Sequence, residues 1–413
     1  MKVFKFGGAS VSKPDAVRNA AGIIEDHASK GLLVVVSAMG KTTNALEAVL
    51  RLSTTGQHHE EIQKLWQYHL DMAQALVGQD HPVQTELKAL FDSMTLALEG
   101  HTDPDCKYDQ VVSHGELFST KILAAFLQSV GVPAVWVDAR QYVVSDSNYR
   151  EGKVDWAATR QRMKSLTPML ADQVVITQGF IASDPAGLTV TLGRDGSDYS
   201  AAIFAACLGA ESVTIWKDVP GVMNADPKRI PSARIFHELP FKEAAEMTYF
   251  GASVIHPKTI KPLANQSIPL YVKNFDDPTL EGTIIHECYV DRLPPLVVFK
   301  ENQCLISCKV TDYSFINEHQ MGTIFNVLSA HKVKINVMQN SAITFSFCVD
   351  FQEARINRLI EALSRDFEVY YNTGLTLITV KNYDAHTFQE YHSLDGVLLE
   401  QSSRSTLQVL VKG

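Results

Sequence analysis

The chain has 413 residues, of which 46% are hydrophobic, and it carries a formal net charge of −9 at pH 7. This length allows a large core in two or three domains, and the acidic balance argues against nucleic acid as the main partner. No uninterrupted apolar run approaches a membrane span, and no basic region with a long apolar core opens the sequence. The six cysteines include no CxxC pair, which is typical of a reducing compartment. We therefore expect a cytoplasmic protein whose partners are small molecules or other copies of itself.

The first predicted elements are a strand over Lys2 to Phe6, a glycine turn, and a helix that begins within SKPD. We expect Gly7 and Gly8 to allow backbone angles closed to other residues and to bring bare N–H groups near a ligand. Lys5 adds a positive charge beside them, and this combination suits a phosphate. The pattern is neither GxxxxGK[ST] nor GxGxxG, and an isolated Lys-x-Gly-Gly also fits an ordinary strand-to-helix turn.

Five further apolar, β-rich segments alternate with helical ones in the first part of the chain. They read LLVVVSA, PAVWVDA, QVVITQGF, SVTIWKDV and IPLYVKN. This alternation predicts an α/β fold in three layers, with helices on both faces of a mainly parallel sheet and ligand sites at the carboxyl ends of its strands. The stretch from 54 to 100 is predicted to be helical, with His58, His59 and His69 as solvated residues rather than metal ligands.

The pattern changes after the segment DDPTLEGTIIHECYVDRLPP. Strands over Cys304 to Val310, Lys334 to Met338 and Ala342 to Val349, with two intervening helices, predict a β-α-β-β-α-β ferredoxin-like module. A second pass begins at LTLITVKN and ends one helix and one strand short. The sequence therefore predicts three domains, at residues 1–290, 300–374 and 375–413.

Hydroxyl and carboxylate side chains stand at two predicted boundaries in the first domain. In VVVSAMGKTTN, Ser37 closes a strand and Thr43 follows a glycine, so both offer hydroxyl donors to a small polar substrate. In VSHGELFSTK, Glu116 lies at a helix start, where it can bind an ammonium group. Helix capping is the alternative explanation for these residues.

Two later clusters combine cations with carboxylates. In TLGRDGSDYSAA, Arg194 stands between glycines and Asp198 opens an alanine-rich helix, and a buried arginine fork suits a carboxylate. In WKDVPGVMNADPKR, Lys217 and Asp218 follow a strand, and a proline-glycine turn leads to a second acidic and basic cluster. A nucleotide would find there lysines, a carboxylate that organises Mg²⁺ and a turn to hold its base.

Taken in this order, the segments resemble the amino acid kinase superfamily, and specifically the aspartate kinases. The matching segments are KFGGASV, SAMGKTTN, SHGELFS, TLGRDGSDYSAA, WKDVPGVMNADPKR, YFGASVIHPKTIKP and VKNFDDPTLEGTII. The C-terminal part is similar to the paired ACT domains of that family, and no homoserine dehydrogenase segment follows it. The resemblance implies a monofunctional enzyme that transfers the γ-phosphate of ATP, with Mg²⁺, to the side-chain carboxylate of L-aspartate, the first step toward lysine, threonine and methionine.

The resemblance also implies a role for each matching residue but assigns no metal ligand. Lys5 would stabilise the transferring phosphoryl group, and Asp198 would share in catalysis. The residues implied in nucleotide binding are Gly7, Gly8, Ser10, Lys217, Asp218, Met223 and Lys228. Those implied in holding aspartate are Ser37, Thr43, Glu116, Arg194 and Asp198, with the arginine on a carboxylate and the acids on the amino group. The nucleophile is a carboxylate already ionised at pH 7, so no general base is required.

Three positions depart from the family pattern. Ser253 stands where FGAKVxHP has a lysine that reaches the nucleotide phosphates, Met223 replaces an aromatic residue, and Lys228 fills an arginine position. The missing charge could come from Lys217, Lys258 or Lys261. Two alternatives stay open: a kinase of glutamate or N-acetylglutamate on the same fold, and a non-catalytic amino-acid sensor. A single methylene separates aspartate from glutamate by only about 1–3 kcal/mol in a pocket.

The ACT-like tail predicts a homodimer and feedback by a pathway end product, lysine or threonine, between which the sequence does not choose. The segments NEHQMG and NVMQNSA carry the candidate effector ligands Met321, Gln339, Asn340 and Ser341. An effector bound there would shift a two-state equilibrium against the active kinase. Turn polarity is the alternative explanation for these side chains.

Overall fold

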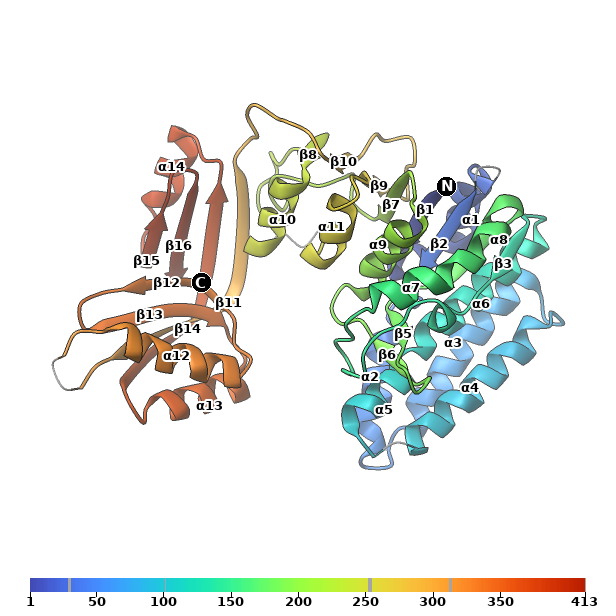
Figure 1. The fold of residues 1–413 in the computed structure, drawn as a ribbon, viewed down its shortest axis with the longest axis horizontal. Coiled ribbons are helices and arrows are strands. Elements are labelled where there is room, and N and C mark those ends of the chain that lie inside the picture. The colour runs from blue at the N-terminus through green and yellow to red at the C-terminus, as the bar shows by residue number, and fades with distance from the viewer. Residues whose placement is uncertain (29–30, 101, 252–254, 312–313, 413) are drawn as a thin grey trace. The chain divides into compact units, whose positions relative to one another are not determined.

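The computed structural model describes residues 1–28, 31–100, 102–251, 255–311 and 314–412. The chain divides into two compact units, each built on its own main sheet (Figure 1). The first unit contains Met1–Val222, Ile235–Ala245 and Ser253–Val290. The second contains Met223–Arg234, Glu246–Ala252 and Asp291–Gly413. Two short segments from inside the first 290 residues therefore group with the C-terminal unit.

In the described part of the first unit, the main sheet has eight strands in the order β3-β4-β2-β1-β7-β9-β10-β8. These are β1 (Lys2–Phe6), β2 (Leu32–Val36), β3 (Ala134–Trp136), β4 (Val174–Gln178), β7 (Ser212–Lys217), β8 (Glu238–Pro240), β9 (Leu270–Asn274) and β10 (Thr283–His286). The strands from β3 to β9 in this order are parallel, β10 is antiparallel to β9, and β8 is parallel to β10. Strands β5 (Ile181–Ser183) and β6 (Thr189–Thr191) form a separate antiparallel pair. The predicted mainly parallel sheet is confirmed.

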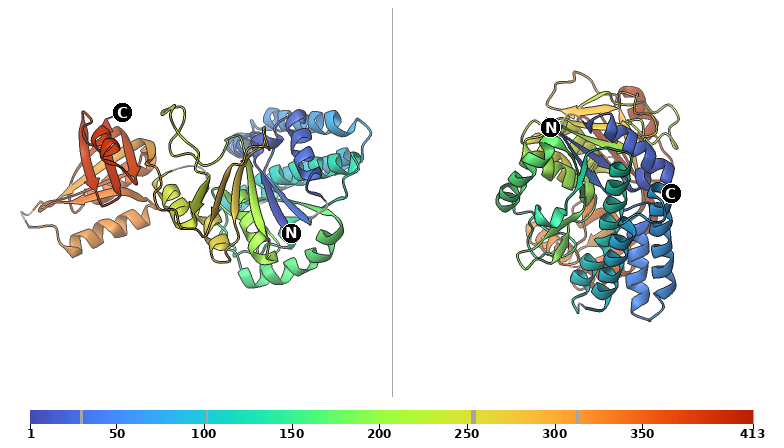
Figure 2. Two further views of the ribbon diagram at one scale, coloured as in Figure 1. Left: turned by 90° about the horizontal axis from the view of Figure 1, so that it is seen from above. Right: turned by 90° about the vertical axis from the view of Figure 1, so that its right-hand side faces the viewer.

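Helices cover both faces of this sheet, as predicted. The helices in this part of the chain are α1 (Pro14–Glu25), α2 (Thr42–Ser53), α3 (His59–Val77), α4 (Val83–Gly100), α5 (Pro104–Val112), α6 (His114–Ser129), α7 (Trp156–Met163), α8 (Thr167–Asp172), α9 (Gly196–Leu208), α10 (Phe241–Phe250), which is divided between the two units, and α11 (Pro257–Ala264). Figure 2 shows the blue and cyan helices on one side of the sheet and the green α9 on the other. Helix α9 contacts β1, β2 and β7, whereas α6 contacts β2, β3 and β4 from the opposite face. None of the described helices combines the length and the apolar character that a membrane crossing requires.

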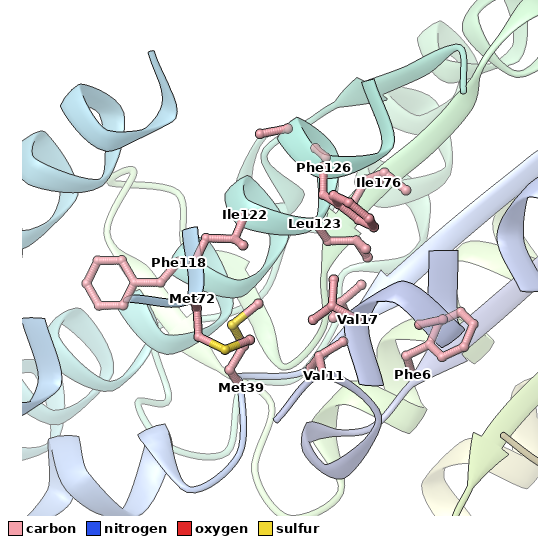
Figure 3. Close-up of a cluster of buried hydrophobic side chains, with 14 of the residues drawn as sticks. Phe6, Val11, Val17, Met39, Met72, Phe118, Ile122, Leu123, Phe126 and Ile176 are labelled. Carbon is pink, nitrogen blue, oxygen red and sulfur yellow. The ribbon is translucent and has the colours of Figure 1, made fainter. Parts of the chain in front are cut away.

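The main hydrophobic core of the first unit lies between the sheet and the helices α1 and α6 (Figure 3). Phe6 of β1, Val17 of α1 and Phe118 of α6 are completely buried in it. Strand β2 reads LLVVV and is buried along its whole length, because helices shield both of its faces. This core fixes the strand ends that carry the candidate site.

Helices α3 and α4 form the helical region predicted between residues 54 and 100, but one histidine there is not solvated. His69 is fully buried, with Nδ1 2.8 Å from the Leu65 carbonyl oxygen and Nε2 3.3 Å from Thr42 Oγ1. Burial lowers the pKa of His69 to about 4, although the carbonyl contact opposes the shift. The imidazole is therefore neutral at physiological pH and belongs to the core, so the solvated position predicted for it is wrong.

In the described part of the second unit, a six-stranded antiparallel sheet has the order β12-β13-β11-β14-β16-β15. Its elements are β11 (Leu296–Lys309), α12 (Glu318–Ala330), β12 (Ile335–Asn340), β13 (Thr344–Asp350), α13 (Glu353–Leu363), β14 (Glu368–Lys381), α14 (Ala385–His392), β15 (Val397–Ser402) and β16 (Thr406–Lys412). Four of these strands, with α12 and α13, form the predicted ferredoxin-like module. Its core includes Ile306, Ile324, Phe347 and Ile356.

The structure corrects the prediction that the second module lacks one strand. Strand β11 begins at Leu296, earlier than predicted, and its residues 296–300 pair with the end of β14, Leu296 opposite Lys381. With β14, α14, β15 and β16, this first half of β11 completes a smaller module. The pairing shifts register after Lys300, and Asn302 has a φ of 54°. The polar residues at this β-bulge interrupt the apolar pattern, so the sequence does not indicate that the strand is continuous.

Candidate active site

Three neighbouring parallel strands carry predicted site residues at their carboxyl ends. Strand β1 lies between β2 and β7, with Phe6 in register with Val36 on one side and Trp216 on the other. Parallel strands end at the same edge of a sheet. The glycine turn after β1, the loop after β2 and the end of β7 therefore lie side by side, as a ligand site requires.

A buried ion cluster joins β1, α9 and β7 at this edge. Lys5 Nζ lies 2.6 Å from one carboxylate oxygen of Asp198, and Lys217 Nζ lies 3.5 Å from the other. Lys5 is 7% exposed and Asp198 is 4% exposed. Burial alone would raise the pKa of Asp198, but the two ammonium groups outweigh burial and hold this pKa below its usual range. One ionised carboxylate between two lysines leaves a net positive charge, which suits a phosphate group.

The two glycines after Lys5 act differently from the prediction. Gly7 has a φ of −76°, and neither it nor Gly8 has a positive φ, so neither needs a backbone angle closed to other residues. A Cβ on Gly8 would lie 2.7 Å from the Ala38 carbonyl oxygen and 3.0 Å from that of Gly40. Gly8 is therefore required for space, because the turn after β1 packs against the loop after β2. A Cβ on Gly7 would lie 3.6 Å from Lys5 Nζ, so Gly7 leaves one approach to the amine open.

Glu116 of α6 is a second buried carboxylate at this edge. It is 3% exposed, Oε1 accepts a hydrogen bond from the Ala38 N–H at 3.3 Å, and Oε2 has no hydrogen-bond partner among the described residues. Burial raises the pKa of Glu116 to about 8, although backbone N–H groups and the charge of Lys5 oppose the shift. A buried oxygen without a donor is costly unless a ligand supplies one. This arrangement fits an ammonium group.

Ser37 directly follows β2, and Thr43 lies half-buried in the first turn of α2.

The loops at this edge are held by a residue that sequence reasoning missed. The Tyr68 hydroxyl of α3 donates to the Ser12 carbonyl oxygen at 2.8 Å and lies 3.0 Å from the place of a Cβ on Gly40. One side chain thus contacts both the turn after β1 and the loop after β2. No motif marks Tyr68, because an aromatic residue on an amphipathic helix is usually a core residue.

Arg194 is not the buried fork that the sequence predicted. Its side chain is 85% exposed, and Nε lies 3.7 Å from a carboxylate oxygen of Asp195. The loop turns through positive φ angles, 78° at Gly193 and 53° at Asp195. The arginine therefore stands at the surface of this loop, and its binding of a substrate carboxylate stays a prediction.

One of the three lysines considered as a replacement for the nucleotide-site lysine lies at this loop. Lys258 Nζ, from α11, is 3.6 Å from the position that a Cβ on Gly193 would take. Lys217 belongs to the buried ion cluster, and Lys261 is an exposed residue of α11. Ser253 lies outside the described residues. Among the described lysines considered, Lys258 is thus the best placed to add charge at the loop.

The remaining predicted nucleotide residues are placed more loosely. Ser10 is 1% exposed within the 3₁₀ helix Gly8–Val11, and Asp218 is exposed directly after β7. Met223 and Lys228 lie in the segment that belongs to the second unit. Their part in nucleotide binding stays a prediction.

The candidate effector residues belong to the second unit. Gln339 and Asn340 are exposed at the end of β12, an edge strand. Ser341 donates through its N–H and its hydroxyl to the Thr344 carbonyl oxygen, at 2.9 and 3.2 Å. Met321 of α12 is partly buried against the core of the module. A turn thus accounts for the polarity of Ser341, whereas the two amides are exposed beside it.

Comparison with known proteins gives this geometry a family. Residues 1–274 match the amino acid kinase family. Lysine-sensitive aspartokinase 3 of Escherichia coli strain K12 is 34% identical over 358 residues, which cover 84% of this chain and 78% of that protein. The chloroplastic bifunctional aspartokinase/homoserine dehydrogenase 2 of Arabidopsis thaliana is 32% identical over 391 residues, which cover 90% of this chain but 42% of that longer protein.

Solved structures agree with these sequence matches. E. coli aspartokinase III in complex with aspartate and ADP, in the R-state, has a TM-score of 0.88 at 29% identity, covering 100% of this chain and 96% of that one. The same enzyme with lysine and aspartate, in the T-state, has a TM-score of 0.84. The family match, on a parallel sheet whose first strand carries a buried lysine and leads into a glycine turn, identifies the class as an amino acid kinase. The chain belongs to the amino acid kinase family, among its aspartate kinases.

Proposed function

We propose that this protein transfers the γ-phosphate of ATP to the side-chain carboxylate of L-aspartate, giving 4-phospho-L-aspartate. The carrying observation is that one sheet edge holds both the positive cluster of Lys5, Asp198 and Lys217 and the unsatisfied buried oxygen of Glu116. The first feature suits a phosphoryl group and the second suits the ammonium group of an amino acid. The E. coli enzyme, solved with aspartate and ADP, supports aspartate as the acceptor and an adenine nucleotide as the donor here.

In the proposed reaction, an aspartate carboxylate oxygen forms a bond to the γ-phosphorus while the bond from that phosphorus to the oxygen of ADP breaks. The attacking carboxylate is ionised at neutral pH, so no residue has to remove a proton. The protein supplies position and charge: Lys5 faces the transferring group, Glu116 binds the ammonium group, and Arg194 binds the α-carboxylate. Asp198 contacts both lysines, so it acts by holding them in place.

ATP enters this proposal as its Mg²⁺ complex. Mg²⁺ usually binds through phosphate oxygens and one or two carboxylates rather than in an all-protein cage. Asp218 fits this requirement as an exposed carboxylate directly after β7, and it would hold the ion. The bound ion would neutralise charge on the phosphate oxygens. Lys258 at the Gly193 loop would add a further positive charge on the nucleotide side.

Trapping the acyl phosphate with hydroxylamine tests the reaction and its substrate. With ATP and Mg²⁺, we expect product from aspartate and about tenfold less or lower from glutamate, which differs by one methylene. N-acetylglutamate should react poorly as well, because it lacks the ammonium group that satisfies Glu116. If glutamate or N-acetylglutamate reacted faster than aspartate, the protein would instead be a kinase of that substrate. Aspartate binding without any product would indicate an amino-acid sensor.

We also propose a homodimer formed through the ACT-like modules and feedback by lysine, with threonine as the alternative effector. The T-state structure of the E. coli enzyme contains lysine. In this chain Phe325 of α12 is 43% exposed and Met338 of the edge strand β12 is 46% exposed, so the module has apolar side chains that a second copy can cover. A cytoplasmic location stays a prediction from the cysteine pattern.

Lysine is expected to inhibit the initial rate, and Asn340→Ala is expected to raise the lysine concentration for half-inhibition by about tenfold, the effect of one lost hydrogen bond to a charged group. Ser329→Ala, at an exposed position at the end of α12, is the matched control. Inhibition curves with lysine, threonine and both together measure the effect. A chain cut near Val290 is unsuitable, because Met223–Arg234 and Glu246–Ala252 belong to the second unit. No response to either amino acid at millimolar concentration would leave the tail as an oligomerisation element.

A further inference from the structure

A group of metal-ligating side chains lies at the β8 edge of the first unit's sheet, outside the proposed active site. Glu238 begins β8, His286 ends β10, and Cys288 follows two residues later. The two strands are parallel neighbours, with Ile284 opposite Glu238 and His286 opposite Pro240. Strand pairing therefore brings together three side chains that are distant in sequence.

The ligand atoms of these three residues form a compact group. His286 Nε2 lies 2.6 Å from Glu238 Oε1, and one ligand atom from each of the three residues lies within 4.8 Å of the others. In a tetrahedral zinc site with bonds of about 2.0–2.3 Å, ligand atoms are about 3.3–3.8 Å apart. Small side-chain rotations would bring all three atoms onto one ion. His286 and Cys288 are half-buried and Glu238 is exposed, so an ion can enter from solvent.

We propose that Glu238, His286 and Cys288 form a Zn²⁺ site completed by a water molecule. Thiolate and imidazole ligands select zinc over hard cations, and three protein ligands with one water is a usual zinc coordination. Mg²⁺ prefers six oxygen ligands, so the Mg²⁺ that accompanies ATP does not compete. The combination of one sulfur, one nitrogen and one oxygen distinguishes this group from an ordinary cluster of surface acids.

The ion would fasten a very short edge strand to its neighbour. Strand β8 covers only Glu238–Pro240 and leads directly into α10, which begins at Phe241. Without metal, the Glu238 carboxylate is hydrogen-bonded to the His286 imidazole and to the Cys288 thiol, and such bonds between partly exposed groups contribute little. An ion that binds the folded chain alone stabilises it by mass action. Zinc binding should therefore raise the melting temperature.

Titration of the reduced, chelator-treated, full-length chain with Zn²⁺ and with Co²⁺ tests the proposal. Co²⁺ bound to a thiolate gives a near-ultraviolet charge-transfer band, so the band reports the cysteine ligand directly. We expect the band to saturate at one Co²⁺ per chain and Zn²⁺ to displace it. Cys288→Ser should abolish the band, and His286→Gln and Glu238→Gln should each weaken Zn²⁺ binding by about tenfold or more.

Two substitutions serve as matched controls. Cys207→Ser removes another half-buried thiol, on α9, and His237→Gln removes the histidine next to Glu238, whose side chain is 75% exposed. Both should leave the band and the affinity unchanged. The exposed Glu238 position keeps the test valid if Cys288→Ser fails to fold.

Three results would overturn the proposal: no band at saturating Co²⁺, a band that survives Cys288→Ser, or Zn²⁺ affinity that none of the three ligand substitutions lowers. The first result would leave Glu238 and His286 as a hydrogen-bonded pair. Either of the others would place the ion elsewhere on the chain. Kinase activity does not enter these readouts, so they stand or fall independently of the proposed reaction.

Discussion

Lys5→Met is expected to lower kcat for aspartate phosphorylation by about 10²- to 10³-fold, the usual loss when one donor aimed at developing negative charge is removed. The Lys5 ammonium group lies in the buried ion cluster, 2.6 Å from an Asp198 carboxylate oxygen and beside the glycine turn after β1. In the proposed mechanism its ammonium group meets the phosphoryl group most closely in the transition state. The value of kcat should therefore fall much more than the KM for aspartate rises. Steady-state kinetics with aspartate and ATP varied separately measure both.

Lys2→Met is the matched control for this substitution. Lys2 stands at the start of the same strand, paired with Leu32 and Ser212, and so at the opposite end of β1 from the turn. Its loss should leave kcat close to the wild-type value. Circular dichroism and thermal melting of both variants separate lost chemistry from lost folding. Wild-type turnover in a folded Lys5→Met chain would contradict the role given to Lys5.

The sheet, and the edge of it at which the candidate residues lie, could be predicted because they follow from local patterns. Strand β2 is apolar at every position, and this marks a strand covered on both faces without any knowledge of its neighbours. Once the strands are parallel, their carboxyl ends meet at one edge. Lys5, Ser37 and Lys217 therefore lie at the same edge of the sheet, although they are far apart in the sequence.

Features that depend on distant parts of the chain could not be predicted in this way. Gly8 is required because a Cβ there would lie too close to the Ala38 carbonyl oxygen. The residues around Gly8 in the sequence do not indicate this contact. The exposure of Arg194 could not be predicted, because the burial of a loop residue depends on which other parts of the chain cover the loop. The first half of β11 pairs with the end of β14, Leu296 opposite Lys381, so its partner lies on the far side of the ferredoxin-like module in the sequence. In each case the outcome depends on the presence or absence of a long-range contact, which leaves no local pattern in the sequence.

Glu116 is expected to make the stability of the ligand-free protein fall as pH rises. Its folded-state pKa is about 8, raised by burial from an ordinary value of 4.5. Between these values the folded protein keeps a proton that the unfolded chain releases, so this contribution is complete below about pH 4.5 and is lost as pH rises through about 8. Thermal melts of wild type and Glu116→Gln across this range should show the variant gaining relative stability as pH rises. Glu25→Gln, at an exposed position on α1, is the control.

The same carboxyl group should make aspartate binding stronger at higher pH. The substrate ammonium group binds the ionised form of Glu116, which is a small fraction at pH 6.5 and the major form at pH 8.5 when the pKa is about 8. For a ligand that binds only the ionised form, Kd should fall by about 25-fold over this range and then level off. Calorimetry should also detect about one proton released per aspartate bound at the lower pH. Glu116→Gln should bind aspartate weakly with no such rise, and N-acetylaspartate, which lacks the ammonium group, should show none with wild type. An aspartate Kd that does not change with pH would mean that Glu116 does not hold the amino group, and another described carboxylate at this edge, Asp198, would have to be tested in its place.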